Sequence, residues 1–330
     1  MGTDRAQHSK MDRLPVFGKG EILLAPSDLA YNPCNDLIFP SVITAQDYFR
    51  NPLGKYYMYY APHNAPGGIC LAHASSLHGP WIEYGKNPLI VNQWLPHHDA
   101  EHVSSPHAIF IPEESRLFLY YHGDNETTHY AVSEDGLTFS YGGIAIDWNM
   151  LPGSDVAAYA RVFRYTPPGS PFRYVMLFAG LKYFPGSWDS YESHGLYSAW
   201  SMDARQWQVE SKPIVSQMDI EDTAFVWSPF LFSWKSKPYV VFHKDLFDAT
   251  LPGGMDTDLY CVEVDADLHP VGPLRLFCSR RVFGNENLRI SDPCLLIEDE
   301  TLYLFAAIGP RLNQSIGLAT AACTLHDWTV

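Results

Sequence analysis

The chain has 330 residues, of which 46% are hydrophobic, so it carries enough apolar material for a large folded core. Its formal net charge of −15 excludes the basic face that nucleic acid or an anionic membrane surface would require, and we expect neither as a partner. Residues 1–20 lack the apolar segment of a secretory signal and no run of about 18 apolar residues follows, so we expect a soluble, cytoplasmic protein.

A unit of four short strand-like segments recurs five times along the chain. Each copy opens with an apolar segment that is broken near its centre: LIFPSVI at 37–43, SSPHAIF at 104–110, AYARVFR at 158–164, VWSPFLF at 226–232 and ISDPCLL at 290–296. An aromatic-rich segment, a small-residue segment and a short closing segment follow each opening. Five copies of a four-strand unit are typical of an all-β fold, the five-bladed β-propeller.

The repeats divide one predicted domain, residues 1–330, into four-stranded antiparallel blades around a central funnel. We expect these blades at 36–85, 101–143, 155–210, 222–279 and 289–330. The last blade ends early, and the strand predicted at 20–27 would complete a blade and close the ring, which removes a free sheet edge.

The segments NPLGKYYMYYAPHN and GICLAHASSLHGPWIEY resemble the first blade of the five-bladed propellers of the arabinanase, xylosidase, invertase and levansucrase group, above all glycoside hydrolase family 43. This resemblance implies that the innermost strand of each blade lines the funnel. It also implies three catalytic acids there: an Asp before Pro in the first blade, an Asp before Pro in the third, and a Glu before Gly-Pro in the fourth.

At the matching positions this chain has aromatic residues: Phe39, Tyr159 and Trp227. Inverting hydrolysis needs one carboxylic acid to protonate the leaving oxygen and one carboxylate to activate water. The side chains of Phe and Trp do neither, so in this register the mechanism of the resembled group is absent. Packing between blades is the alternative role for Phe39 and Trp227.

Displaced acids offer a hydrolytic alternative, because a bulge can turn a neighbouring side chain inward. In that case Asp36 would be the base, Asp155 the modulator, and Glu221 or Asp222 the proton donor.

The leading hypothesis is a divergent propeller enzyme that binds a small molecule in the funnel and catalyses a non-hydrolytic acid/base step, such as a cyclisation, isomerisation or elimination. Arg161 would polarise an oxygen, and His107 or Asp292 would move the proton. Alternatively, His107 is a hydrogen-bonded structural residue and Arg161 pairs with Asp292. The expected ligand-binding residues are Phe39, Ser105, Tyr159, Trp227 and His243. A carbohydrate-binding propeller without catalysis is a further alternative.

Histidines close the second segments of three blades, at His63, His122 and His243, and the sequence also contains His97, His98 and His102. Converging imidazoles make an axial metal ion conceivable, and members of the resembled group sometimes hold calcium or water there. However, no HExxH spacing or nucleotide-binding motif is present, so we predict no cofactor. The expected partner is a small-molecule or sugar ligand, and the sequence leaves the oligomeric state open.

Overall fold

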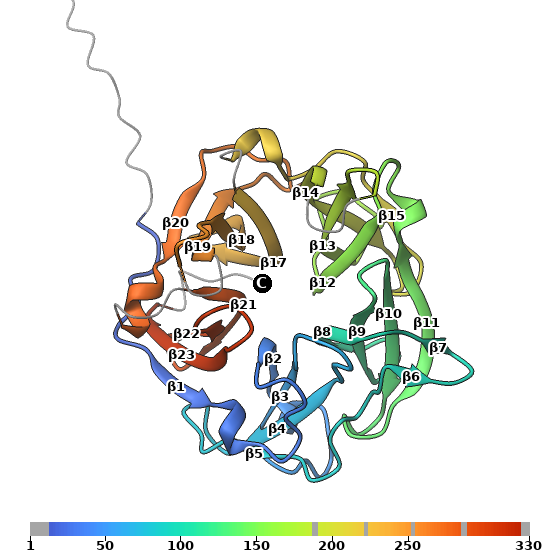
Figure 1. Cartoon of the computed structure of the whole chain (residues 1–330), viewed down its shortest axis with the longest axis vertical. Coiled ribbons are helices and arrows are strands. Elements are labelled where there is room, and N and C mark those ends of the chain that lie inside the picture. The colour runs from blue at the N-terminus through green and yellow to red at the C-terminus, as the bar shows by residue number, and fades with distance from the viewer. Residues whose placement is uncertain (1–12, 187–190, 221–223, 252–254, 285–288, 325–330) are drawn as a thin grey trace, which may run out of the picture.

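Five antiparallel sheets stand around one axis in the computed structural model, which describes residues 13–186, 191–220, 224–251, 255–284 and 289–324 (Figure 1). This arrangement confirms the five-bladed β-propeller. The innermost strands are β2 (Ile38–Ile43), β8 (Val103–Ile111), β12 (Val156–Arg164), β17 (Ala224–Trp234) and β21 (Ile290–Glu298).

The remaining strands follow outward in each sheet. The second strands are β3 (Tyr56–Ala61), β9 (Arg116–Gly123), β13 (Tyr174–Tyr183), β18 (Lys237–Phe247) and β22 (Thr301–Ile308). The third strands are β4 (Cys70–Ala74), β10 (Thr127–Ser133), β14 (Tyr191–Ser201), β19 (Met255–Glu263) and β23 (Ser315–Ala322). The outer strands are β5 (Ile82–Glu83), β11 (Ser140–Asp147), β15 (Gln208–Val209) with β16 (Val215–Ser216), β20 (Arg275–Cys278) and β1 (Glu21–Leu24).

Short elements connect the blades. A hairpin of β6 (Gln93–Trp94) and β7 (His98–Asp99) projects beside the second blade (Figure 1). In the part of the chain that the structure describes, the helical elements are short 3-10 helices: η1 (Pro26–Asp28), η2 (Ala45–Asp47), η3 (Trp148–Met150), η4 (Gln217–Asp219) and η6 (Arg280–Phe283). Among the described residues, no helix has the length and apolar character needed to cross a membrane.

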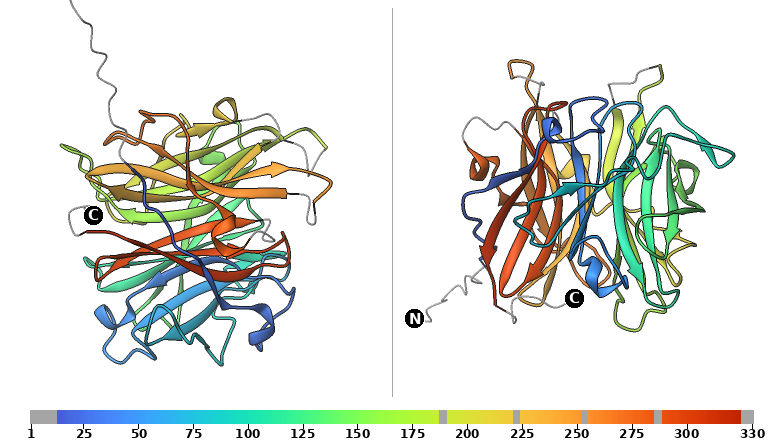
Figure 2. Two further views of the ribbon diagram at one scale, coloured as in Figure 1. Left: turned by 90° about the vertical axis from the view of Figure 1, so that its left-hand side faces the viewer. Right: turned by 90° about the horizontal axis from the view of Figure 1, so that it is seen from below.

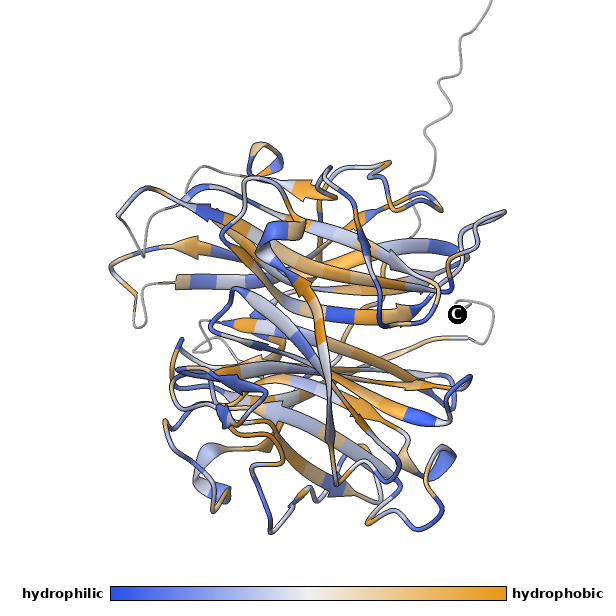
Figure 3. Ribbon diagram, turned by 90° about the vertical axis from the view of Figure 1, so that its right-hand side faces the viewer, coloured by the Kyte–Doolittle hydropathy of each residue, from blue (hydrophilic) through white to orange (hydrophobic). Residues whose placement is uncertain are grey.

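The second strands hold the ring together because both of their faces are buried. All six residues of β3 are buried, and successive side chains point to opposite faces of the sheet. Tyr57 and Tyr59 share a hydrophobic cluster with Leu119 of the second blade, whereas Met58 and Tyr60 share one with residues of the fifth blade. Figure 3 shows hydrophobic residues along the strands and hydrophilic residues in many of the loops.

Each innermost strand is broken by the same bulge. The pairing register with the second strand shifts between Ile38 and Ser41, and equivalent shifts occur in the other four blades. One residue of each bulge has a positive φ: 56° in Phe39, 58° in Ser105, 60° in Tyr159, 53° in Ser228 and 55° in Asp292. A proline follows this residue in four blades, and Ala160 follows it in the third. Proline suits a bulge because it has no backbone N–H to donate to the ladder, and the ladder is interrupted there.

The ring closes through the N-terminal strand. β1 pairs antiparallel with β23, with Glu21 opposite Leu318, so the fifth blade takes strands from both ends of the described chain (Figure 2). Leu24 of β1 is buried in the hydrophobic cluster of that blade. β1 is thus the outer strand of the fifth blade and brings that blade to four strands.

Candidate functional site

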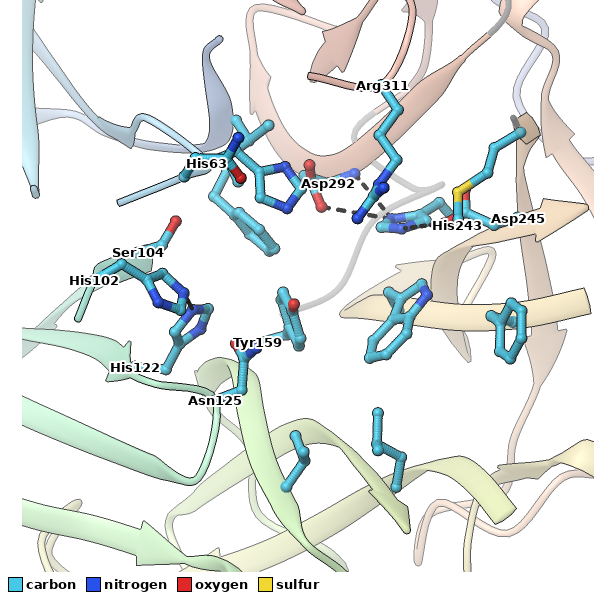
Figure 4. Close-up of a pocket in the computed structure, with 18 of the residues that line it drawn as sticks. His63, His102, Ser104, His122, Asn125, Tyr159, His243, Asp245, Asp292 and Arg311 are labelled. Atoms are coloured by element: carbon cyan, nitrogen blue, oxygen red, sulfur yellow. Dashed lines mark hydrogen bonds and ion pairs between the residues drawn. The ribbon is translucent and has the colours of Figure 1, made fainter. Parts of the chain in front are cut away.

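A cavity of about 560 Å³ opens on the propeller axis and takes lining residues from all five blades (Figure 4). From the innermost strands it is lined by residues at or before the bulge: Ile38, Phe39, Ser104, Val156, Tyr159, Phe225, Trp227 and Asp292. None of the described residues after the bulge on these strands lines it. The bulges therefore mark the floor of the cavity.

One part of the lining is a continuous aromatic surface. Phe39 stacks on Tyr159 with ring centroids 5.3 Å apart, and Tyr159 meets Trp227 edge to face at 5.1 Å. Tyr191 extends this surface from Trp227 to Phe225. Burial raises the pKa of Tyr159, which keeps its hydroxyl protonated near neutral pH. Of the three positions at which the resembled group would carry acids, Tyr159 thus contacts both of the others through its ring.

A buried ionic network lies between the fourth and fifth blades. Asp292 accepts hydrogen bonds from the hydroxyls of Ser228 (2.6 Å) and Ser291 (3.0 Å). His243 stands between two carboxylates, with Nδ1 3.5 Å from Asp292 and Nε2 3.7 Å from Asp245. Burial lowers the pKa of His243, against the opposite effect of these two neighbours.

Arg289 completes this network from the segment before β21. It donates to Asp245 at 3.1 Å and to the side chain of Gln314 at 3.2 Å. Burial acts to raise the pKa of Asp245, but the charges of Arg289, His243 and Arg311 and the hydrogen bond from Thr257 together outweigh it, so the pKa of Asp245 is lowered. The carboxylates of this network therefore have donors or a cation beside them.

A second group of imidazoles faces the cavity from the second blade. The Nε2 atoms of His102 and His122 are 3.3 Å apart, and Nδ1 of His102 lies 3.5 Å from Asp124. Burial lowers the pKa of both histidines. The ring of His122 also meets Tyr159 edge to face at 5.0 Å, so this pair adjoins the aromatic surface.

The first blade contributes His63, which follows β3 and lines the cavity (Figure 4). Its Nδ1 lies 3.4 Å from Oδ2 of Asp36, which is fully buried. Oδ1 of Asp36 accepts a hydrogen bond from the backbone N–H of Gln314 at 2.6 Å. Asp36 thus lies behind an imidazole that lines the cavity.

Five of the eight residues expected in the funnel line the cavity, and three do not. Lining it are Phe39, Tyr159, Trp227, His243 and Asp292. Ser105 points elsewhere, and its neighbour Ser104 takes the lining position. His107 and Arg161 are also outside the lining, because both lie after the bulge of their strand.

His107 and Arg161 form a buried pair beneath the cavity floor. Arg161 donates to the carbonyl oxygens of Pro40 (3.2 Å) and Pro106 (3.4 Å), and His107 donates from Nε2 to the carbonyl of Val162 (2.7 Å). Burial, and then the charge of Arg161, lower the pKa of His107 to about 3. Burial also lowers the pKa of Arg161. Neither side chain can reach a ligand in this cavity without rearrangement.

The displaced acids are not brought into the cavity where the structure describes them. Asp36 lies behind His63, and Asp155 accepts a hydrogen bond from the backbone N–H of Tyr183 at 2.9 Å. Neither lines the cavity. Glu221 and Asp222 lie outside the described residues.

Asp245, Arg289, Arg311 and Ser104 line the cavity but were not expected there. Asp245 could have been found, since it is two residues beyond His243 on β18 and alternate residues of a strand share a face. Arg289 and Arg311 belong to the segments before β21 and after β22, where no strand period fixes a direction.

The described polar groups of the cavity do not fit a calcium ion. Calcium takes six to eight oxygen ligands. Here four imidazoles line the cavity, and the carboxylates of Asp245 and Asp292 already accept hydrogen bonds from protein donors. Within the described segments, no group of three or more His, Cys, Asp or Glu side chains is arranged to hold a metal.

Solved structures with similar folds include several glycoside hydrolases. A complex of BT0996 with RGII has a TM-score of 0.66 at 13% identity, covering 96% of this chain and 94% of that one. A thermostable family-43 glycoside hydrolase has a TM-score of 0.58 at 12% identity, covering 87% and 90%. The α-L-arabinofuranosidase PaAbf62A from Podospora anserina, in complex with cellotriose, has a TM-score of 0.60 at 9% identity, covering 93% and 98%.

No protein-family model matches the chain, and no curated protein matches it by sequence. The structural likeness shows that the chain shares the fold of the five-bladed propeller glycoside hydrolases. At these identities the likeness concerns the fold alone, and function has to be argued from the cavity.

Proposed function

We propose that this chain is an enzyme that binds a small, partly apolar or sugar-like molecule in the axial cavity and moves a proton on it without hydrolysis. The product would arise by cyclisation, isomerisation or elimination. The observation that carries this proposal is the contact of Phe39, Tyr159 and Trp227 as one aromatic surface at the positions where the resembled group would carry acids.

The aromatic surface supports binding rather than acid–base chemistry. Rings of this kind pack against planar or apolar faces, including the C–H face of a sugar, and their quadrupoles stabilise a cationic intermediate. The phenyl ring of Phe39 and the indole of Trp227 cannot protonate a leaving oxygen or activate water at neutral pH. In this proposal the polar side chains that line the cavity transfer the proton, and they include imidazoles and Asp292.

Glycoside hydrolysis is the second candidate, and one observation favours it. Glu101, Asp245 and Asp292 line the cavity, so three carboxylates are present there. Hydrolysis would require one of them to act as acid and another as base or nucleophile across the bound sugar. The cellotriose held by the similar Podospora anserina protein suggests a sugar ligand for this chain in either case, and also for a binding protein without catalysis.

Product mass distinguishes these functions. A panel of oligosaccharides, glycosides, and planar or terpenoid small molecules is first screened by thermal shift, and each stabilising compound is then incubated with the protein and followed by mass spectrometry. We expect a product of unchanged mass, or one that has lost a leaving group. A mass gain of one water with release of sugar would establish hydrolysis, and tight binding with no product would establish a binding protein.

Trp227→Ala tests whether the aromatic surface holds the ligand. We expect this variant to bind the stabilising compound at least about tenfold more weakly, since a buried aromatic contact is worth more than about 1.4 kcal/mol. Trp148→Ala is the matched control, because Trp148 is exposed on η3 and does not line the cavity. Equal binding by both variants would contradict the proposed site.

A further inference from the structure

We infer that His63 is the general base of the axial cavity and that Asp36 is the residue that positions it. This inference rests on the proposed function and assigns its proton acceptor.

The strand register places the two side chains together. β2 and β3 are antiparallel, with Ile38 opposite Ala61. Continuing this register by two residues beyond the strand ends sets Asp36 opposite His63. The bulge of β2 begins after Ile38, so it does not disturb this end of the ladder. The pairing thus follows from the backbone of two paired strands.

Asp36 fixes which nitrogen of His63 carries the proton. The carboxylate is fully buried, and a buried charge is costly unless donors face it. The backbone N–H of Gln314 satisfies Oδ1, whereas neither Oδ2 of Asp36 nor Nδ1 of His63 has a hydrogen-bond partner among the described residues, and these two buried atoms lie 3.4 Å apart. A proton on Nδ1 is therefore favoured, which leaves Nε2 with its lone pair.

Nε2 of His63 is available where the other cavity imidazoles are engaged. The His63 side chain is 23% exposed, and none of the described residues hydrogen-bonds to its Nε2. In contrast, both nitrogens of His243 lie beside charged partners, and the Nε2 atoms of His102 and His122 face each other. A carboxylate behind one imidazole nitrogen and an open cavity at the other is the arrangement that a general base requires.

The proton step balances within one bound molecule. Nε2 of His63 would take a proton from an acidic C–H or O–H of the ligand, and the bonding electron pair would stay on the ligand. The resulting imidazolium would be stabilised by Asp36. The proton would then return to a different ligand atom in an isomerisation or cyclisation, or leave on the departing group in an elimination. Asp36, the base of the hydrolytic alternative, would thus act through an imidazole and not on water.

The tautomer can be measured without a substrate. In protein labelled with ¹⁵N at histidine, we expect the neutral form of His63 to show a protonated Nδ1 and an unprotonated Nε2. In Asp36→Asn the carboxylate is lost, and we expect the population of the Nδ1–H form to fall. A His63 that carries its proton on Nε2 in the wild-type protein would overturn the inference.

Chemical modification tests whether Nε2 is open. Diethyl pyrocarbonate transfers an ethoxycarbonyl group to an unprotonated imidazole nitrogen and releases ethanol and carbon dioxide. By peptide mapping of briefly treated folded protein, we expect His63 to be modified at least tenfold faster than His102, whose Nδ1 also faces a carboxylate but whose Nε2 is engaged. Equal or slower modification of His63 would contradict the inference.

Turnover separates this inference from the proposed function. Once a converted ligand is found, we expect His63→Gln to lower kcat at least 100-fold with little change in ligand affinity, and His102→Gln to lower it less. Unchanged turnover in His63→Gln would overturn the base while leaving the function in place. If no compound that binds the wild-type protein is converted, the proposed function itself fails.

Discussion

Phe39 and Tyr159 adopt a left-handed backbone conformation that bulky residues rarely take, with φ of 56° and 60°. Such a residue costs of the order of 1–3 kcal/mol, so the surrounding structure has to hold it in place. Here the bulge and the stacking of the two rings do so. Strain of this kind is found at sites where a side chain must point in a direction that an ordinary strand does not allow.

Ser105 has the same backbone conformation, but no hydrogen bond of its side chain to a described residue offsets the strain. Its φ is 58°, its side chain is buried, and its hydroxyl has no hydrogen-bond partner among the described residues. We expect Ser105→Gly to raise the free energy of unfolding by about 1 kcal/mol, because glycine relieves the backbone strain and removes an unsatisfied buried hydroxyl. Urea denaturation measures the change.

Ser115→Gly is the control for that substitution. Ser115 also has a positive φ, of 51°, but it is exposed, so only the backbone contribution changes. A larger gain in Ser115→Gly than in Ser105→Gly would show that the buried hydroxyl of Ser105 is satisfied in solution.

At the scale of the element, β1 is the strand that closes the ring. Leu24 is buried in the cluster of the fifth blade, whereas Ile22 of the same strand is 62% exposed. We expect Leu24→Ala to lower the free energy of unfolding by about 2–4 kcal/mol, as is usual for a buried leucine, and Ile22→Ala to change it by less than about 0.5 kcal/mol. Urea denaturation of the two variants tests this expectation, and equal small effects would mean that β1 contributes little to stability.

The innermost strands show how far the sequence could predict the site. The recurring break with proline predicted a strand that departs from a regular ladder, and the three aromatic residues at the inferred acid positions do line the cavity. The sequence also predicts His107 and Arg161 in the funnel, because they belong to the same strands, and this prediction is wrong. The sequence contains no signal that the cavity ends at the bulge, since this limit depends on how five sheets tilt around one axis.

The pairing of Asp36 with His63 is a feature of the site that the sequence does not predict. The sequence predicts Asp36 as a displaced acid and His63 as a histidine at a strand end, and it does not join the two. The antiparallel register that joins them could be known only once Ile38 was found opposite Ala61. Contacts between neighbouring strands are thus accessible to sequence reasoning only after the bulge positions are fixed.

At the scale of the whole molecule, buried histidines couple stability to pH. Burial lowers the pKa of His107 to about 3 and the pKa values of His129 and His194 to about 4. In the unfolded chain a histidine has a pKa of about 6.5. Between these values the unfolded state binds protons that the folded state does not, so the free energy of unfolding falls as the pH is lowered below about 6.5.

His107→Gln measures the share of one histidine in this acid sensitivity. Between pH 6 and pH 4 we expect the pH dependence to be weaker in this variant than in the wild type, by up to about 1.4 kcal/mol per pH unit, since one fewer proton is taken up on unfolding. Urea denaturation at several pH values gives the slope. His269→Gln is the control, because His269 is exposed, and a slope that changes equally in both variants would contradict the assignment.

The fivefold bulge has a consequence for how such proteins diversify. Five equivalent backbone positions, one in each blade, have a positive φ, and in this chain they hold two aromatic residues, two serines and an aspartate. The ring persists in proteins only 9–13% identical to this chain. The bulge therefore does not depend on one type of residue: rings, hydroxyls and a carboxylate occupy the same backbone conformation in a single ring of blades, and the sheets around them keep the same order.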